Sequence, residues 1–292
     1  MTSNSNETIL FKCDNSYNTF IEILKYLGTV FYLSIGFILH IFLMKTILIS
    51  QKSFFKDNSY FQLHVVDSIA SSLLILGDVF NTRLFMYVPP LCPIAGPFFL
   101  KSPYFSKFLY VLINHCRFAK SVVQIFMVSN RMTCVLWPVA YNQVQISRLF
   151  SRISNFQTWK RSLPLIRLLI IFLPIGGTWN LWISKVFPVQ QYGGLALSYS
   201  RNVHWAALSL FQSIYILTAL AFTVICTTVT LYKMLVLPER LKAAEKSLCF
   251  TSIFISITFL LVAATQILWV TCCDSDWLFA IQFLAFDTFT VG

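Results

Sequence analysis

Seven long apolar segments divide this chain, and each of the first six is long enough to cross a membrane as a helix. A helix needs about 20 residues to span the hydrocarbon core of a bilayer. The segments are far longer than barrel strands and do not alternate in polarity, which argues against a membrane β-barrel. We therefore predict an all-α membrane protein whose residues 21–292 form one bundle of seven transmembrane helices, after a polar amino-terminal segment of residues 1–20. The predicted helices cover residues 21–49, 60–88, 105–136, 163–182, 205–237, 247–270 and 277–292.

The composition excludes a soluble globular protein. Hydrophobic residues make up 57% of the chain and charged residues 11%, whereas soluble domains carry about 25% charged residues. A net charge of +11 would suggest nucleic-acid binding in a soluble protein. Here the basic residues lie between the apolar segments, so we predict a lipid membrane as the partner and no nucleic acid.

The distribution of basic residues predicts which ends of the helices face the cytoplasm. The side reached after the first, third and fifth helices holds 13 lysines and arginines, and the other side holds seven, Arg83 among them. Arg117 and Lys120 lie too deep in the third helix to count for either side. Because basic residues are retained on the cytoplasmic side, the amino terminus is predicted to lie outside the cell. The glycosylation sequon at Asn6 agrees with this orientation.

A segment of residues 130–141, NRMTCVLWPVAY, ends the third apolar run. Val, Pro and Tyr follow its arginine by four, seven and ten residues, a spacing that resembles the cytoplasmic end of helix three in rhodopsin-like receptors. A guanidinium offers five donors in a fixed fork, so it can pair with a neighbouring helix in one state and with a partner protein in another. The alternative interpretation is a basic anchor at a helix end. The resemblance places a G-protein coupling site at Asn130, Arg131, Met132, Pro138 and Tyr141, where Asn130 and Met132 replace the usual acidic and aromatic residues.

Further stretches extend a family resemblance from the first helix into the seventh. They are residues 67–93 with PPLCP, residues 130–138, the glycine pair at 193–194 with SLFQ at 209–212, and EKSL at 245–248. Together they resemble the nematode serpentine receptor class gamma family, which are GPCR-like chemoreceptors. The resemblance implies a receptor at the plasma membrane of a sensory neuron, which detects a small ligand and signals through a heterotrimeric G protein. The chain departs from rhodopsin-like receptors because its sixth helix lacks a proline and its seventh lacks Asn-Pro-x-x-Tyr.

Polar residues within the predicted helices are the candidates for ligand contact, because such groups are costly in a bilayer and usually face the interior of a bundle. Asp78 and Arg83, five residues apart, are expected either to pair with each other or to face a ligand. For the other candidates the alternative is a hydrogen bond within the core. Since apolar and aromatic residues dominate these helices, the expected ligand is small and largely apolar. The candidates are Asp78, Arg83, Asn114, His115, Arg117, Gln212 and Gln266.

Asp67 lies about two turns into the second helix from its cytoplasmic end. Its surroundings are similar in spacing to the aspartate of helix two in rhodopsin-like receptors, which can hold a sodium ion. The alternative is a structural carboxylate that is hydrogen-bonded within the bundle. We expect the structural role, and predict no metal or other cofactor for this chain.

Cys92 lies in the outer loop after the second helix, where a disulfide can form. The next outer loop contains no cysteine, so a bridge must use Cys13, Cys272 or Cys273. We favour the pairing of Cys13 with Cys92, because the other two adjoin the sixth helix.

A small-molecule transporter is the alternative function. Many transporters carry inverted repeats and broken helix pairs, but no internal repeat is visible here. An enzyme is not predicted, since the sequence shows no metal-ligand spacing, close aspartate pair or nucleophile motif. The last predicted helix of 16 residues reaches about 24 Å, less than the hydrocarbon thickness of about 30 Å, so we expect a truncated seventh helix.

Overall fold

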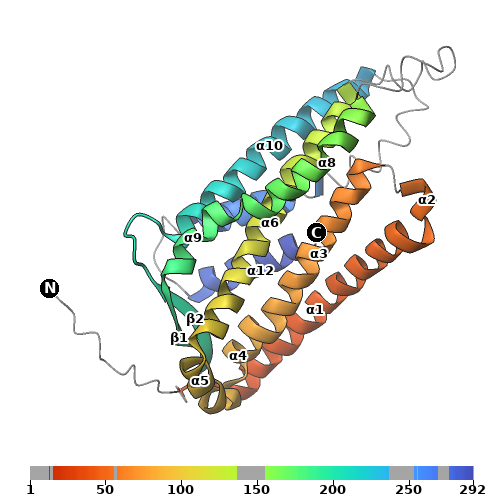
Figure 1. Cartoon of the computed structure of the whole chain (residues 1–292). Helices are drawn as coiled ribbons and strands as arrows, with labels where there is room; N and C mark the ends of the chain where they lie inside the picture. Colours follow the sequence, from red (N-terminus) through yellow and green to blue (C-terminus); the bar gives the residue numbers. More distant parts are fainter. Residues whose placement is uncertain are drawn as a thin grey trace, which may run out of the picture.

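The computed structural model describes residues 13, 16–55, 58–136, 155–236, 253–254, 256–268 and 276–291, and these residues fold into a bundle of long helices (Figure 1). Two shorter apolar helices, Ser256–Leu268 and Ala280–Val291, fall within the sixth and seventh predicted segments. All seven apolar segments therefore contain helix, and residues 247–252 of the sixth predicted segment lie outside the described residues. The described helices that are long and apolar enough to span a membrane are Thr19–Ser50, Ser59–Tyr87, Pro103–Leu136, Arg161–Ile183 and Leu208–Lys233.

The first two spans depart from regular α-helix near one end. α1 (Thr19–Lys45) continues as the π-helical segment η1 (Thr46–Ser50), followed by the short α2 (Lys52–Phe55). The second span consists of α3 (Ser59–Gly77), the π-helical segment η2 (Asp78–Arg83) and α4 (Leu84–Tyr87). A turn η3 (Pro89–Leu91) and α5 (Cys92–Lys101) lead from there to α6 (Pro103–Leu136).

The second half of the chain supplies the remaining spans. α8 (Asn155–Phe172) and α9 (Ile175–Ile183) form the fourth span, with a break at Pro174. The strands β1 (Lys185–Gln191) and β2 (Gly194–Ser200) precede α10 (Leu208–Val236). The helix Ser256–Leu268 and α12 (Asp276–Val291) complete the described bundle.

α6 is the central helix of the bundle. Of its most apolar stretch 72% is buried, against 17% for the first helix. It packs against α3, α8, α9 and α10, and Figure 1 shows it crossing the middle of the bundle between α3 and the pair α8 and α10. The buried Val122, Val123 and Met127 of α6 share a cluster with Leu63 of α3 and Ile166 of α8.

A two-stranded antiparallel sheet lies outside the seven predicted helices. β1 and β2 pair from Lys185 opposite Ser200 to Gln191 opposite Gly194. The turn residues Tyr192 and Gly193 have φ angles of 53° and 76°, as in the two-residue turns that suit the twist of a hairpin. These strands were not predicted from the sequence, because a search for apolar runs long enough to span the membrane does not detect short strands.

The hairpin is held against the second span by close backbone contact. A side chain at Gly194 would overlap the backbone of Phe85 and Met86 at α4, so β2 packs directly on that helix. Ala196 of the same strand lies in a buried cluster with Met86 and Tyr87. The hairpin is therefore a fixed cover for the end of the bundle that it occupies, which we call the hairpin end.

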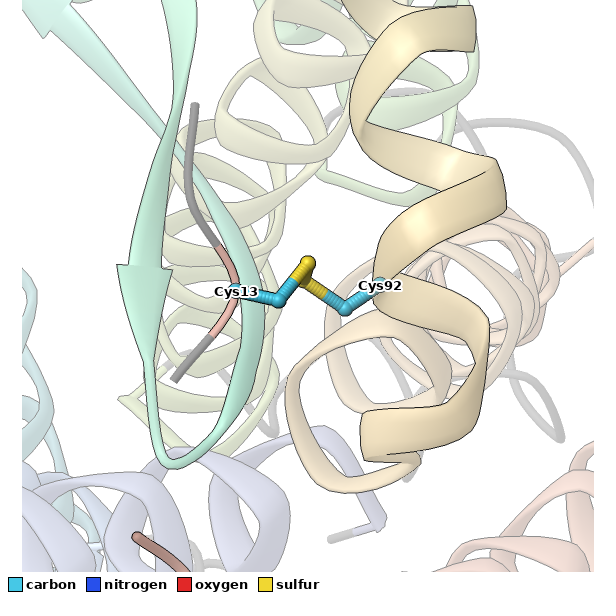
Figure 2. Close-up of a disulfide and its surroundings, with 2 residues drawn as sticks. All are labelled: Cys13 and Cys92. Carbon is cyan, nitrogen blue, oxygen red and sulfur yellow. A yellow bond between two sulfur atoms is a disulfide. The ribbon is translucent and has the colours of Figure 1, made fainter. Parts of the chain in front are cut away.

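A disulfide joins Cys13 to Cys92 at the hairpin end, the pairing that we favoured from the sequence. Figure 2 shows the bridge running from Cys13, beside the hairpin, to the first turn of α5. Cys272 and Cys273 lie outside the described residues. The bond ties the segment before α1 to the loop after the second span, 79 residues away.

Candidate ligand-binding site

Two adjoining cavities lie beneath the hairpin, between α6, α10, α12 and the second span. Their volumes are about 260 Å³ and about 430 Å³; the larger lies within the range of about 300–1,000 Å³ that is usual for small-molecule sites, and the smaller lies just below it. We call the two together the hairpin-end cavity. The residues that line both parts are Tyr110, Asn114, Arg117, Ser198 and Phe283.

The lining of the cavity is more polar than the apolar segments suggested. The smaller part adds Asn81, Thr82 and Gln191, and the larger part adds Arg201, Ser209, Gln212 and Gln282. Apolar side chains such as Phe283 and Phe286 complete the walls. The difference arises because the hairpin region, the second span, α6, α10 and α12 each contribute a few polar residues, which are far apart in the sequence and meet only in the fold.

Amide side chains connect the helices around the cavity. The Gln212 Nε2 of α10 donates to the Asn114 Oδ1 of α6 at 3.1 Å, and the Asn114 Nδ2 donates to the Tyr110 carbonyl at 2.8 Å. Gln282 Nε2 of α12 donates to Gln266 Oε1 at 2.8 Å. Each of these amides retains donors or acceptors beyond those bonds. The amides that line the cavity can therefore bind a ligand while they also connect the helices.

Two ion pairs adjoin the lining of the cavity. Arg117 Nη2 is 2.8 Å from Asp78 Oδ1, and Arg83 Nη2 lies 2.8 Å and 2.9 Å from the two carboxylate oxygens of Asp287. Asp78 and Arg83 therefore do not pair with each other, which was one of the two alternatives; their two ion pairs join the second span to α6 and to α12. Both Asp78 and Arg83 are buried, and neither lines the cavity.

The π-helical segment η2 explains how both charges of the second span reach the interior. Residues five apart in an α-helix point about 140° away from each other, so one of them would face away from the bundle. The wider turn of a π-helix brings such residues closer to one face. Asp78 and Arg83 begin and end η2, which lets one meet α6 and the other meet α12.

The seven candidate ligand residues therefore fall into three groups. Asn114, Arg117 and Gln212 line the cavity. Asp78, Arg83 and Gln266 are buried behind it, in ion pairs or in the amide contact with Gln282. His115 is half-buried on another face of α6, where it interacts with the backbone of Ile171 in α8.

Asp67 is paired with a buried lysine, Lys120 of α6. The Lys120 Nζ of α6 lies 2.6 Å from Ser71 Oγ, 3.4 Å from Asp67 Oδ2 and 3.4 Å from the Thr290 carbonyl of α12. His40 Nε2 of α1 lies 3.1 Å from the same carbonyl. A fixed amine thus stands where the sodium interpretation would place an ion, and it links the second, third and seventh helices.

The other end of α6 carries the predicted coupling residues, and we call it the Arg131 end. Asn130 Nδ2 donates to Ser59 Oγ at 2.8 Å, and the Arg131 guanidinium lies 5.6 Å from the ring centre of Tyr60. Both residues are buried against the start of α3, whereas Met132 is half-buried. Pro138, Tyr141 and the sequon residue Asn6 lie outside the described residues.

Sequence reasoning missed several residues at these sites. Arg201 and Ser198 lie in or beside the hairpin, and no apolar pattern marks a hairpin of this length. Lys120 and Asp287 were visible as charges within apolar runs, but their partners lie 53 and 204 residues away. The available signal was a balance of charge, because the three aspartates of the described helices that are buried, Asp67, Asp78 and Asp287, each pair with a cation of another helix.

Comparison with known proteins finds relatives along nearly the whole chain. Residues 26–292 match the Srg family of chemoreceptors. Serpentine receptor class gamma-15 of Caenorhabditis elegans is 50% identical over 296 residues, which cover 100% of this chain and 88% of the relative. The class gamma-17 and gamma-16 receptors of the same organism are 49% and 43% identical, over 96% and 98% of this chain and 84% and 85% of the relatives.

Proposed function

Because this chain belongs to the Srg family of chemoreceptors, which are seven-helix serpentine membrane proteins, we propose that it binds a small molecule in the hairpin-end cavity and signals through a heterotrimeric G protein. Membership of this family makes the chain a multi-pass membrane receptor of the chemosensory class. It does not favour the transporter alternative, and the family is not one of enzymes.

One observation carries the proposal: a single helix connects the cavity to the predicted coupling site. α6 supplies Tyr110, Asn114 and Arg117 to the cavity and carries Asn130 and Arg131 at its far end. Arg117 and Arg131 are about 21 Å apart along the axis at 1.5 Å per residue. A displacement of α6 by a ligand would therefore reach the contacts of Arg131 with α3 without any intermediate element.

We place the hairpin end outside the cell and the Arg131 end in the cytoplasm of a sensory neuron, with the bundle in the plasma membrane. Two observations support this orientation. The basic residues are more numerous on the side of the Arg131 end, which favours the cytoplasm. The disulfide between Cys13 and Cys92 lies at the hairpin end, and such bonds persist in oxidising compartments.

The contacts of Arg131 support a resting role that coupling would release. Its guanidinium lies over Tyr60, and its neighbour Asn130 bonds to Ser59, both at the start of α3. In this proposal a G protein binds the Arg131 guanidinium when α6 and α3 separate. Position 130 is an asparagine, so Arg131 lacks the adjacent acidic partner of the rhodopsin-like motif.

The test is signalling in a reporter cell that expresses the full chain and is exposed to a panel of small molecules. Arg131→Ala is expected to reach the cell surface and to lose most of the G-protein response. Lys45→Ala is the matched control, because Lys45 is an exposed basic residue at the same end of the bundle. Equal signalling by both variants would mean that Arg131 is only a basic anchor at a helix end. Ligand-dependent flux of a small molecule without G-protein activation would favour the transporter alternative.

A further inference from the structure

We propose that the ligand carries a carboxylate group, which binds between Arg117 and Arg201 while its hydrocarbon part lies against the aromatic wall of the hairpin-end cavity. This inference rests on the proposed function, since it names the ligand class of the same site. It replaces the largely apolar ligand that the sequence suggested with an amphiphilic one.

The first argument is the sign of charge at the cavity surface. Arg117 lines both parts of the cavity and Arg201 lines the larger part, whereas no aspartate or glutamate is among the described lining residues. Asp78, the carboxylate that pairs with Arg117, has only 4% of its side chain exposed and does not line the cavity. A ligand in the cavity therefore meets cationic groups, and a site with low-dielectric walls strengthens their attraction for an anion.

The second argument is the geometry of Arg117. Its pair with Asp78 uses the Nη2 nitrogen, and 18% of its side chain remains exposed. A guanidinium presents five donors in a planar fork, so one edge can hold Asp78 while another edge meets a ligand carboxylate. Arg83 differs, because its side chain is 3% exposed and bonds both oxygens of Asp287.

The remaining walls match an amphiphile. Gln212 and Gln282 supply amide donors beside Arg117, and Phe283 and Phe286 supply apolar surface in the same part of the cavity. The Arg117 guanidinium lies 5.3 Å from the ring centre of Phe286, so polar and apolar groups adjoin. A volume of about 430 Å³ for this part favours a small organic acid with a hydrocarbon tail.

The experiment compares acids with their neutral esters. Butyrate, hexanoate, octanoate and phenylacetate are each tested beside the matching methyl ester, in the reporter cell and by thermal stabilisation of the purified full chain in detergent. The acids are expected to bind and activate at concentrations about 10- to 100-fold lower than their esters, as the loss of one charge-assisted contact implies.

Two variants test the arginines without leaving a buried charge. Arg201→Gln changes an exposed residue and is expected to weaken the acids about tenfold while leaving the esters unchanged. The double variant Asp78→Asn with Arg117→Gln removes both members of the ion pair, and it should abolish the preference for acids. Lys185→Gln is the matched control, because Lys185 is an exposed cation of the same hairpin that does not line the cavity.

The outcomes separate this inference from the proposed function. If esters are as potent as acids, or if Arg201→Gln and the double variant leave the preference unchanged, the carboxylate site is refuted and the receptor function stands. If the surface-expressed chain responds to none of the acids but does respond to neutral compounds, the inference fails in the same way. If it neither binds nor responds to any compound of the panel, both fail.

Discussion

The buried pair of Arg83 with Asp287 offers a direct test of how charge holds this bundle together. Arg83 Nη2 lies within 2.9 Å of both carboxylate oxygens, and the two side chains are 3% and 6% exposed. The Arg83 guanidinium also lies 3.8 Å from the ring centre of Phe283, so this ring covers it on one side. Asp287→Ala would leave a charged guanidinium enclosed by protein.

Breaking a buried pair in this way costs about 3–5 kcal/mol, because the remaining charge is uncompensated. We expect Asp287→Ala to lower the free energy of unfolding in detergent by that amount, and Arg83→Met to do the same. The double variant Arg83→Met with Asp287→Leu should recover most of the loss, since replacing both members of a buried pair by apolar residues is often neutral. The measurement is a double-mutant cycle of unfolding free energies.

One control variant and two possible results test whether Arg83 and Asp287 stabilise the bundle as a pair. Arg167→Gln removes an exposed hydrogen bond to Gln62 of 3.1 Å, and it is expected to cost no more than about 1 kcal/mol. The reasoning is refuted if Asp287→Ala is as mild as this control. It is also refuted if the effects of the two single changes simply add in the double variant, because additivity would mean that the two charges do not depend on each other.

Three further changes test other contacts of the bundle. Cys13→Ser, Cys92→Ser and the double change should lower stability equally, by about 4 kcal/mol for a loop of this length; unequal losses in thermal unfolding would show that one cysteine acts outside the bridge. Lys120→Met should reduce surface expression by leaving Asp67 without its amine, and adding Asp67→Asn should restore much of it; no restoration would assign another role to the lysine. Gly194→Ala should lift the hairpin from the second span and destabilise the chain by about 1–3 kcal/mol, as calorimetry in detergent would show, and unchanged stability would mean that the hairpin is not seated on that backbone.

The helical part of the fold could be predicted from the sequence because the membrane imposes a simple rule. Each span must be about 20 residues long and satisfy its own backbone hydrogen bonds, so apolar length is enough to find it. The first six segments follow this rule, and all seven contain helix in the structure. The predicted helices also limit which cysteines can pair, because only those on the outer side can reach Cys92. One pairing could therefore be favoured from the sequence.

The pairing of charges could not be predicted, because it depends on contacts between distant helices. From their spacing we expected Asp78 and Arg83 either to pair with each other or to face a ligand, but each pairs with a residue of another helix. Arg83 was also counted with the outer basic residues, although the structure buries it at 3% exposure. Leaving it out of the count strengthens the predicted orientation, since it removes a cation from the less basic side.

The polarity of the candidate site was underestimated for a related reason. Asn114, Gln212 and Gln282 each lie alone in an apolar run. From the sequence, such a residue is interpreted as a contact between helices as readily as a contact with a ligand. Ser198 and Arg201 come from the hairpin region, which has no transmembrane signal. Only the convergence of three helices and the hairpin gathers these groups around one cavity, and that convergence is a property of packing.

The partners Arg83 and Asp287 are separated by 204 residues, and this distance has a consequence for synthesis. At about 5–20 residues per second, the ribosome needs about 10–40 s after making Arg83 before Asp287 exists. The pairs of Asp78 with Arg117 and of Asp67 with Lys120 close after only 39 and 53 residues. During biogenesis the second span must therefore wait in the bilayer with an uncompensated guanidinium, whose long side chain can reach the nearby head groups, until the arrival of α12 draws it into the bundle.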